Sequence, residues 1–128
     1  PIPAELERVV PGVKEREVSG VKAISNKRAK ACAIPAKVKR KVAQRDQIDG
    51  WTCCVLCGSP KGLPEAHYIS RADGGLGIEQ NIVTLCRRCH DVFDNGTREQ
   101  RREFGEQIKG YLMAIYPDWD EDKLIYKR

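Results

Sequence analysis

Two cysteine pairs of the form CxxC, Cys54–Cys57 and Cys86–Cys89, constrain the fold of this chain more than any other feature. Together they can supply four thiolates, which complete the tetrahedral shell of a structural zinc ion and leave no open coordination position for a substrate. We therefore expect zinc to join two distant segments of the chain. Any catalytic chemistry must then be carried by other residues.

The sequence has six cysteines, which could instead form disulfide bonds. The paired spacing favours metal, as does a reducing compartment. Cys53 could replace Cys54 as a ligand through a CxxxC step, but Gly58 favours Cys54, because a glycine with positive φ lets a tight turn close after the second thiolate. Cys32 has no partner at metal spacing, and we expect it to be a buried or idle thiol.

Length and composition indicate one small domain. The chain has 128 residues and is 41% hydrophobic, so a zinc cross-link would support a core that is limited by size. No apolar run approaches the roughly 18 residues needed to span a bilayer, and no apolar segment follows a basic start as in a signal peptide. We therefore expect a cytoplasmic protein that does not associate with membranes.

The basic residues are concentrated in one stretch of the chain. Nine of them, and no acidic residue, lie between positions 22 and 45: Lys22, Lys27, Arg28, Lys30, Lys37, Lys39, Arg40, Lys41 and Arg45. Lys and Arg at this density can replace the counterions condensed along phosphates, which is typical of a nucleic-acid-binding surface. A charge run by itself is more often a solvated face or a tail. Beside a candidate catalytic site, the nucleic-acid interpretation is favoured.

The chain divides into an N-terminal arm and one domain. Residues 1–34 contain several prolines and scattered Gly, Ser and Asn without a sustained apolar period, which predicts a basic, extended and partly flexible arm. Residues 35–128 form the domain, with its core at about 51–96 and a C-terminal helix and tail at about 97–128. Pro35 is suited to the first turn of a helix that continues to about Arg45.

Within the core we expect two short strands and one helix. The run at 67–69 is β-type, and the apolar run at 82–85 ends at the second CxxC pair. A helix should begin near Cys86 and continue to Asp94. Asn95-Gly96 should end it, since a glycine just past the last turn is the usual stop.

The C-terminal part predicts one longer helix. Thr97 and Gln100 have the spacing of a capping box. The helix should end at Tyr116, before Pro117. Four apolar residues at helical spacing form its predicted core stripe: Phe104, Ile108, Leu112 and Ile115. Trp119, Leu124, Ile125 and Tyr126 are expected to fold the tail back onto the domain, although residues 118–122 could equally extend into solvent.

The spacing of polar residues in the core suggests a second metal site. His90 and Asp94 are four residues apart, so on a helix both side chains lie on one face and can converge on a single divalent ion. His67 is expected in a strand or hairpin, and zinc would fix where that hairpin meets the helix. A neutral imidazole near such an ion can take a proton from water, while imidazole and carboxylate ligands leave coordination positions open for a phosphate oxygen.

Taken together, these residues resemble the HNH nuclease family, the ββα-metal group with an added four-cysteine zinc site. The resemblance covers roughly a third of the chain: Cys54-Val-Leu-Cys57-Gly58, Ala66-His67-Tyr-Ile-Ser-Arg71, Gly74-Gly75, Asn81-Ile-Val-Thr-Leu-Cys86-Arg-Arg-Cys89-His90 and Asp94. It implies an α+β fold with a small zinc-stabilised ββα-metal core and flanking helices. The segment from Arg98 onward is similar to HNH proteins of bacteriophages and prophages, which implies phage packaging or host DNA-processing proteins as partners.

The resemblance also implies a role for each motif residue. His67 matches the general base that activates water, and Asn81 matches the residue that braces the ββ loop and so orients this histidine. His90 matches a ligand of the catalytic ion, which would be Mg²⁺, Mn²⁺, Ni²⁺ or Zn²⁺, and Asp94 lies where many members have a second helical ligand. Arg71, Arg87 and Arg88 are expected phosphate contacts near the site, and Lys37, Lys39, Arg40 and Lys41 are expected contacts to double-stranded DNA.

One position departs from the family pattern. Many members have Asp or His directly before the general base, as a further ligand, and this chain has Ala66. The ion would then be held by His90, Asp94 and water, or would recruit the neighbouring Glu65. We expect weaker metal binding than in a site with a full set of ligands.

The sequence therefore predicts a metal-dependent DNA endonuclease that hydrolyses phosphodiester bonds with a His general base and one catalytic ion. The alternative is a non-catalytic zinc module that binds DNA or a protein partner through a degenerate HNH site. A zinc deaminase is excluded, because its CxxC follows a proline and pairs with an H-x-E motif. Here Thr84 and Leu85 precede Cys86, and His67 is followed by Tyr68 and Ile69.

Overall fold

A computed structural model describes residues 26–127 of the chain. By its contacts the chain divides at Ala31, and the second unit comprises the described residues from Ala31 onward. The helices and strands occur in the order α3 (Asn26–Cys32), α4 (Ala36–Arg45), β1 (Gln47–Ile48), β2 (Trp51–Thr52), β3 (Leu63–His67), η2 (Arg71–Asp73), β4 (Ile82–Leu85), α5 (Arg87–Asn95), α6 (Arg98–Ile115) and η3 (Glu121–Leu124). The predicted α+β class is confirmed.

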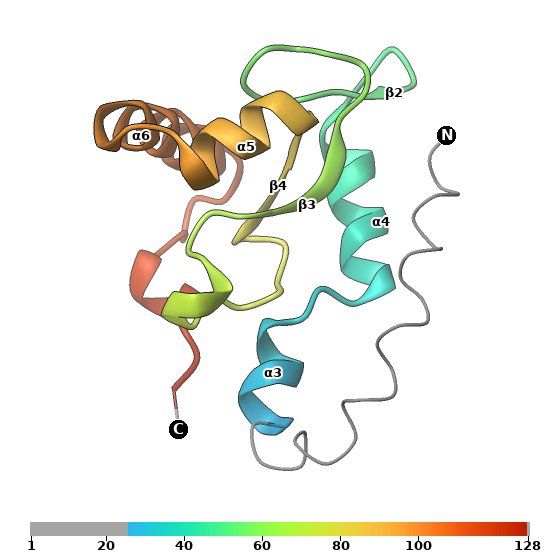
Figure 1. The fold of residues 1–128 in the computed structure, drawn as a ribbon. Helices are drawn as coiled ribbons and strands as arrows, with labels where there is room; N and C mark the ends of the chain where they lie inside the picture. Colours follow the sequence, from blue (N-terminus) through green and yellow to red (C-terminus); the bar gives the residue numbers. More distant parts are fainter. Residues whose placement is uncertain (1–25, 128) are drawn as a thin grey trace, which may run out of the picture. The chain divides into compact units, whose positions relative to one another are not determined.

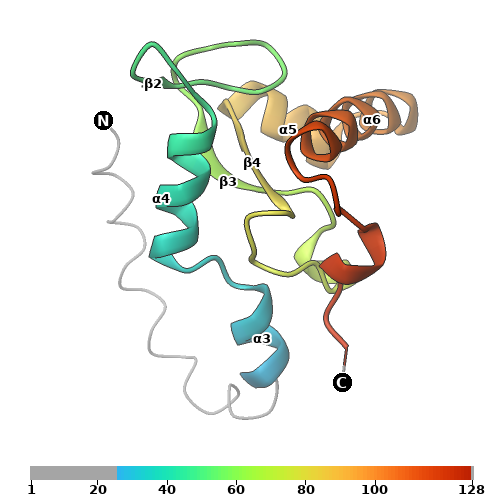
Figure 2. The same cartoon turned by 180° about the vertical axis from the view of Figure 1, so that it is seen from behind.

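An antiparallel hairpin of β3 and β4 forms the centre of the second unit, with α4 on one side and α5 and α6 on the other (Figures 1 and 2). His67 pairs with Ile82, and Ala66 pairs with Val83. The strand predicted at 67–69 was wrong in its bounds, since β3 ends at His67. The reason is that the backbone N–H and C=O of Ile69 bond to the side chain of Asn81, which replaces the strand partner.

The helices flanking the hairpin begin and end close to the predicted positions. Pro35 precedes α4, Cys86 caps α5, and Thr97 and Gln100 form the predicted capping box of α6. The helix α5 ends at Gly96, but this glycine has φ −75° and is not left-handed. Glycine is needed there for space, because a Cβ would lie 2.5 Å from the carbonyl oxygen of Val92.

The core of this unit lies between the hairpin and α6. Ala66, Val83 and Leu85 are fully buried together with Ile108 and Leu112 of α6. Ile115, predicted to continue this stripe, is 36% exposed. The prediction was therefore wrong for this residue, because the core cluster takes in Leu112 and, partly buried, Tyr116 but not Ile115.

The sequence predicted the C-terminal end of the described chain correctly but not its N-terminal end. Residues 26–32, predicted to be extended, form α3, in agreement with the high helix propensity of the Lys, Arg and Ala residues there. The rest of the predicted arm, residues 1–25, lies outside the described residues. The tail folds back as expected: Leu124 is buried, Ile125 forms a bridge with Gly75, and the indole of Trp119 donates to the carbonyl of Gln80.

Within residues 26–127, no helix is both long and apolar enough to cross a membrane.

A buried ion pair, Arg45 and Asp46, fastens α4 to the hairpin and to α6. The guanidinium of Arg45 donates to the carboxylate of Asp46 and to the carbonyl oxygens of Glu79 and Ile82. Asp46 is 4% exposed and accepts from the backbone N–H of Thr84 and from the Tyr111 hydroxyl. Because the partners lie in the loop before β4, in β4 and in α6, this pair fixes the mutual positions of these segments.

We expect Asp46→Asn to lower the free energy of unfolding by about 3 kcal/mol, since it leaves the buried Arg45 charge without its counter-ion. Chemical denaturation would measure this change. Asp49→Asn is the matched control, because Asp49 is an exposed residue of the β1–β2 turn with φ 54°, a conformation that Asn tolerates. Equal unfolding free energies for the two variants would contradict the role assigned to the pair.

Candidate functional site

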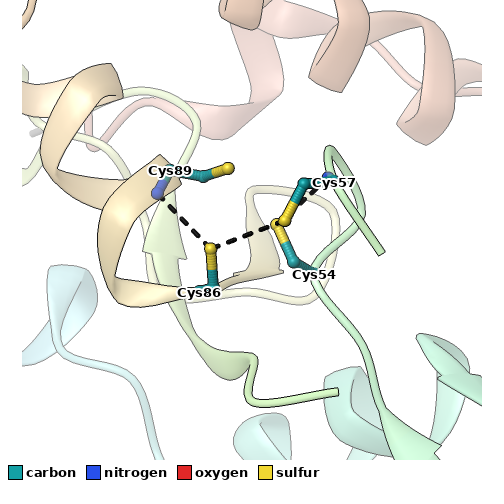
Figure 3. A group of neighbouring side chains, drawn as sticks. All are labelled: Cys54, Cys57, Cys86 and Cys89. Atoms are coloured by element: carbon teal, nitrogen blue, oxygen red, sulfur yellow. Dashed lines mark hydrogen bonds between the residues drawn. The ribbon is translucent and has the colours of Figure 1, made fainter. Parts of the chain in front are cut away.

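The four predicted cysteine ligands converge at the start of α5. The sulfur atoms of Cys54, Cys57, Cys86 and Cys89 all lie within 4.8 Å of one another (Figure 3). The sulfurs of Cys57 and Cys86 are 3.6 Å apart, close to the separation of about 3.8 Å that a tetrahedral site with Zn–S bonds of about 2.3 Å requires. The four cysteines thus form a cluster whose geometry fits a structural metal ion.

The backbone around the cluster is suited to holding thiolates. The N–H groups of Cys57 and Cys89 each lie 3.5 Å from the sulfur of the cysteine three residues earlier, Cys54 and Cys86. Burial by itself would raise the pKa of Cys54, but backbone N–H donors, led by Cys57, outweigh it and lower that pKa to about 7. Gly58 has φ 82°, as predicted for the turn after the second thiolate.

The thiols of Cys57 and Cys89 have a pKa above the ordinary value of cysteine. Burial and the neighbouring thiols of Cys86 and Cys54 raise the pKa of Cys89 well above its ordinary value. A bound divalent cation offsets this repulsion and takes the cysteines as thiolates. Cys53 lies outside the cluster, because its sulfur is placed to donate to the carbonyl oxygen of Trp51 at 3.4 Å.

His67, at the end of β3, lines a pocket of about 980 Å³ that we call the His67 pocket. Its Nε2 lies 2.9 Å from the carbonyl oxygen of Cys32. Since a carbonyl can only accept, Nε2 carries the proton and the neutral ring keeps Nδ1 as its acceptor. Burial lowers the pKa of His67, against the opposing effect of the Cys32 carbonyl. The imidazole is therefore held in the unprotonated form that a base requires.

The segment that supplies this carbonyl passes close to the loop before β4. The backbone N–H of Gly77 donates to the carbonyl of Ala31 at 2.9 Å. A Cβ at Gly77 would lie 1.9 Å from the carbonyl oxygen of Ala33. Only glycine permits this approach, so residue 77 helps to place the carbonyl that orients His67.

Asn81 braces the loop that follows His67. Its side chain is fully buried and accepts from the N–H of Ile69 while donating to the carbonyl oxygens of Ile69 and Leu76. Its own carbonyl accepts from the N–H of Tyr68, the residue after the histidine. The side-chain amide thus holds both ends of the loop that leaves β3.

His90 and Asp94 lie on one face of α5, as their spacing predicted. Nε2 of His90 is 3.3 Å from Oδ2 of Asp94. His90 lines a smaller pocket of about 320 Å³, the His90 pocket, and Asp94 lines both this pocket and the His67 pocket. Asp94 therefore borders the pockets of both histidines.

The comparison with known protein families agrees with this arrangement. Residues 54–92 match the model of the family described as HNH endonuclease. We call residues 54–92, which are similar to this family, the HNH segment. The match covers less than half of the chain. It includes the four cysteines, His67, Asn81 and His90, whereas Asp94 lies two residues beyond it. Neither a curated protein nor a solved structure matches the chain significantly.

The HNH segment also shows what Ala66 and Glu65 contribute. Ala66 is fully buried in the core cluster, so a larger side chain at this position would enter the core and could not reach the pocket of His90. Glu65, on the opposite face of β3, lines the His90 pocket together with His90 and Asp94. Glu65 also pairs with Lys39 at 3.8 Å. Among the described residues, the four cysteines are the one group of three or more candidate ligands at close spacing.

The predicted nucleic-acid contacts are distributed unevenly around the two pockets. Arg87 lines the His90 pocket, and the charge of Arg71 is close enough to affect the pKa of His67. Arg88 is exposed. None of the four predicted contacts on α4 (Lys37, Lys39, Arg40 and Lys41) lines either pocket, and two of them form ion pairs, Lys39 with Glu65 and Lys41 with Glu79.

Sequence reasoning missed the basic side chains of α6. Arg98, Arg101 and Arg102 line the His67 pocket. A signal for them was present, since their spacing of three and four residues places them on one face of the predicted helix. The denser basic run at 22–45 is the stronger signal for nucleic-acid contacts in the sequence.

We expect the HNH segment to hold one zinc ion per chain and Cys86→Ser to lose both the ion and the fold, because metal binding supplies free energy of folding. Elemental analysis and circular dichroism would measure the two losses. Cys53→Ser is the matched control, as a buried cysteine outside the cluster. A Cys86→Ser protein as stable as the parent, or a parent without zinc, would contradict the assignment.

Proposed function

We propose that this protein is a metal-dependent endonuclease that hydrolyses phosphodiester bonds of double-stranded DNA. The observation that carries the proposal is the state of His67, a neutral imidazole oriented by the Cys32 carbonyl in the same pocket as Asp94. A general base must lie in a pocket that admits substrate and must be unprotonated near neutral pH. His67 meets both requirements.

In the proposed reaction, Nδ1 of His67 takes a proton from the water that attacks phosphorus. The Cys32 carbonyl then stabilises the imidazolium, since Nε2 continues to donate to it. Asn81 acts through His67, because its side chain fixes the backbone immediately after the histidine. These three groups belong to three segments that the fold brings together.

His90 and Asp94 fit a hard divalent ion, since imidazole and carboxylate both suit Mg²⁺, Mn²⁺, Ni²⁺ or Zn²⁺ and their ligand atoms are only 3.3 Å apart. When bound, such an ion would stabilise the charge that develops on the leaving oxygen. Glu65 is the nearest carboxylate able to act as a third ligand from β3, and its bond to Lys39 would have to break.

Charge supports DNA as the substrate. The chain has a formal net charge of +5, and its exposed basic residues include Lys37, Arg40 and Lys41 on α4 and Arg71, Arg87 and Arg88 near the site. We propose that these residues and Lys39 contact phosphates. A phage or prophage origin, with packaging or host DNA-processing proteins as partners, and a cytoplasmic location complete the proposal.

The decisive experiment is incubation of supercoiled plasmid with the protein and Mg²⁺ or Mn²⁺. We expect conversion to nicked or linear DNA, and a loss of at least about 10²-fold in rate for His67→Ala, as expected when general-base assistance is removed. Zinc content and circular dichroism of the variant should match the parent. Absence of cleavage by the parent with every tested ion, combined with DNA binding, would favour the non-catalytic zinc module instead.

We expect Asp94→Ala to raise the concentration of Mn²⁺ needed for half-maximal cleavage at least tenfold, because loss of a ligand should cost no less than loss of an outer-sphere partner. DNA binding measured without metal should change little. Asp118→Ala is the control, since Asp118 is an exposed carboxylate outside both pockets. An unchanged Mn²⁺ requirement for Asp94→Ala would show that other residues hold the ion.

A further inference from the structure

We infer that Arg98, Arg101 and Arg102 of α6 form a phosphate clamp that holds the DNA strand across the His67 pocket. This inference rests on the proposed function, since it concerns the substrate of the same site. It assigns the clamp a role distinct from that of α4. The basic residues of α4 would add general affinity for DNA, whereas the clamp would place one strand beside His67.

The first support is position. Residues 98, 101 and 102 follow the helical spacing of three and four and line the same pocket as His67 and Asp94. Gly105 continues this face, and a Cβ there would lie 3.6 Å from the ring of Phe93 and 4.0 Å from that of Tyr68. The face of α6 that carries the arginines therefore runs directly beside the residue that follows His67.

The second support is that the three guanidinium groups are available. All three residues are exposed, and none takes part in an ion pair within residues 26–127. Lys109, farther along the same pocket, is instead paired with Glu121 at 3.4 Å. Arginine binds phosphate oxygens through two parallel N–H donors, which makes it the residue best suited to orient a phosphate.

The third support is the charge balance of the pocket. Four carboxylates line it: Asp73, Asp94, Glu106 and Glu121. Asp73 accepts from the Ser70 hydroxyl at 3.1 Å, and Glu121 is neutralised by Lys109. Asp94 is the proposed ion ligand. With an ion on Asp94, the three arginines face two remaining carboxylates, Asp73 and Glu106, so positive charge exceeds negative charge by one beside His67.

The fourth support is rigidity. Ile108 and Leu112 anchor α6 in the core, and the Tyr111 hydroxyl donates to the buried Asp46 carboxylate. The Thr97 capping box fixes the first turn, from which Arg98 projects. Because the backbone of α6 is held at both ends, the arginines keep a constant distance from His67. A fixed distance is what positioning of a strand requires.

The test measures binding separately from cleavage. In the His67→Ala background, we expect the double variant Arg101→Gln/Arg102→Gln to bind a DNA duplex about tenfold more weakly. Its slope of log K against log salt should fall by about 1.8, since each lost phosphate contact removes about 0.9. With His67 restored, KM for cleavage should rise about tenfold. Arg101→Lys/Arg102→Lys should restore the salt slope of the parent but reverse only part of the rise in KM.

Lys61→Gln/Lys123→Gln is the control, because it removes the same charge from exposed positions outside both pockets. Equal affinity and salt slope for the arginine variant and this control would overturn the clamp. The binding measurement tests the clamp even if the parent cleaves no DNA. Absence of cleavage would count against the proposed nuclease and leave the clamp as a DNA contact.

Discussion

The convergence of four thiols is the interaction on which the rest of the structure depends. It joins the loop after β2 to the junction of β4 and α5. Cys86 caps α5 and Cys89 is buried within its first turn, so the cluster fixes the rotation of this helix about its axis. That rotation in turn directs His90 and Asp94 toward the pockets. A metal ion at the cluster would thus position the candidate site without taking part in its chemistry.

Buried polar groups fix the relative positions of the segments, which the small apolar core cannot do alone. Val83, Leu85, Ile108 and Leu112 supply apolar contacts that are not directional. The amide of Asn81 and the Arg45–Asp46 pair add bonds of fixed geometry, each satisfied by several partners. Such bonds select one arrangement of segments because an alternative arrangement would leave a buried polar group unpaired. This selectivity explains how a short hairpin can hold His67 in one orientation.

The electrostatics of the site divide into two regions. The His90 and Asp94 side chains offer donors for a cation, while the facing wall of α6 is lined by arginines that suit an anion. His67 lines the same pocket as Asp94 and these arginines, and burial lowers its pKa. A phosphodiester bound to a metal ion needs the same three elements: a cation at one oxygen, a base near the attacking water and positive charge along the flanking phosphates. The proposed nuclease and the proposed clamp follow from this single arrangement.

Sequence alone determined the features that depend on local spacing. The CxxC pairs, the i,i+4 pair of His90 and Asp94, the Thr97 capping box and the helix after Pro35 were all predictable, because each involves residues within one or two turns of one another. Tertiary structure decided the features that join distant segments. These are the Cys32 carbonyl on His67, the end of β3 at His67 that the Asn81 side chain imposes, the burial of Ala66 and the arginines of α6 that line the His67 pocket. None follows from periodicity, because each depends on which surface a residue meets once the four-cysteine cluster and buried hydrogen bonds have fixed the packing.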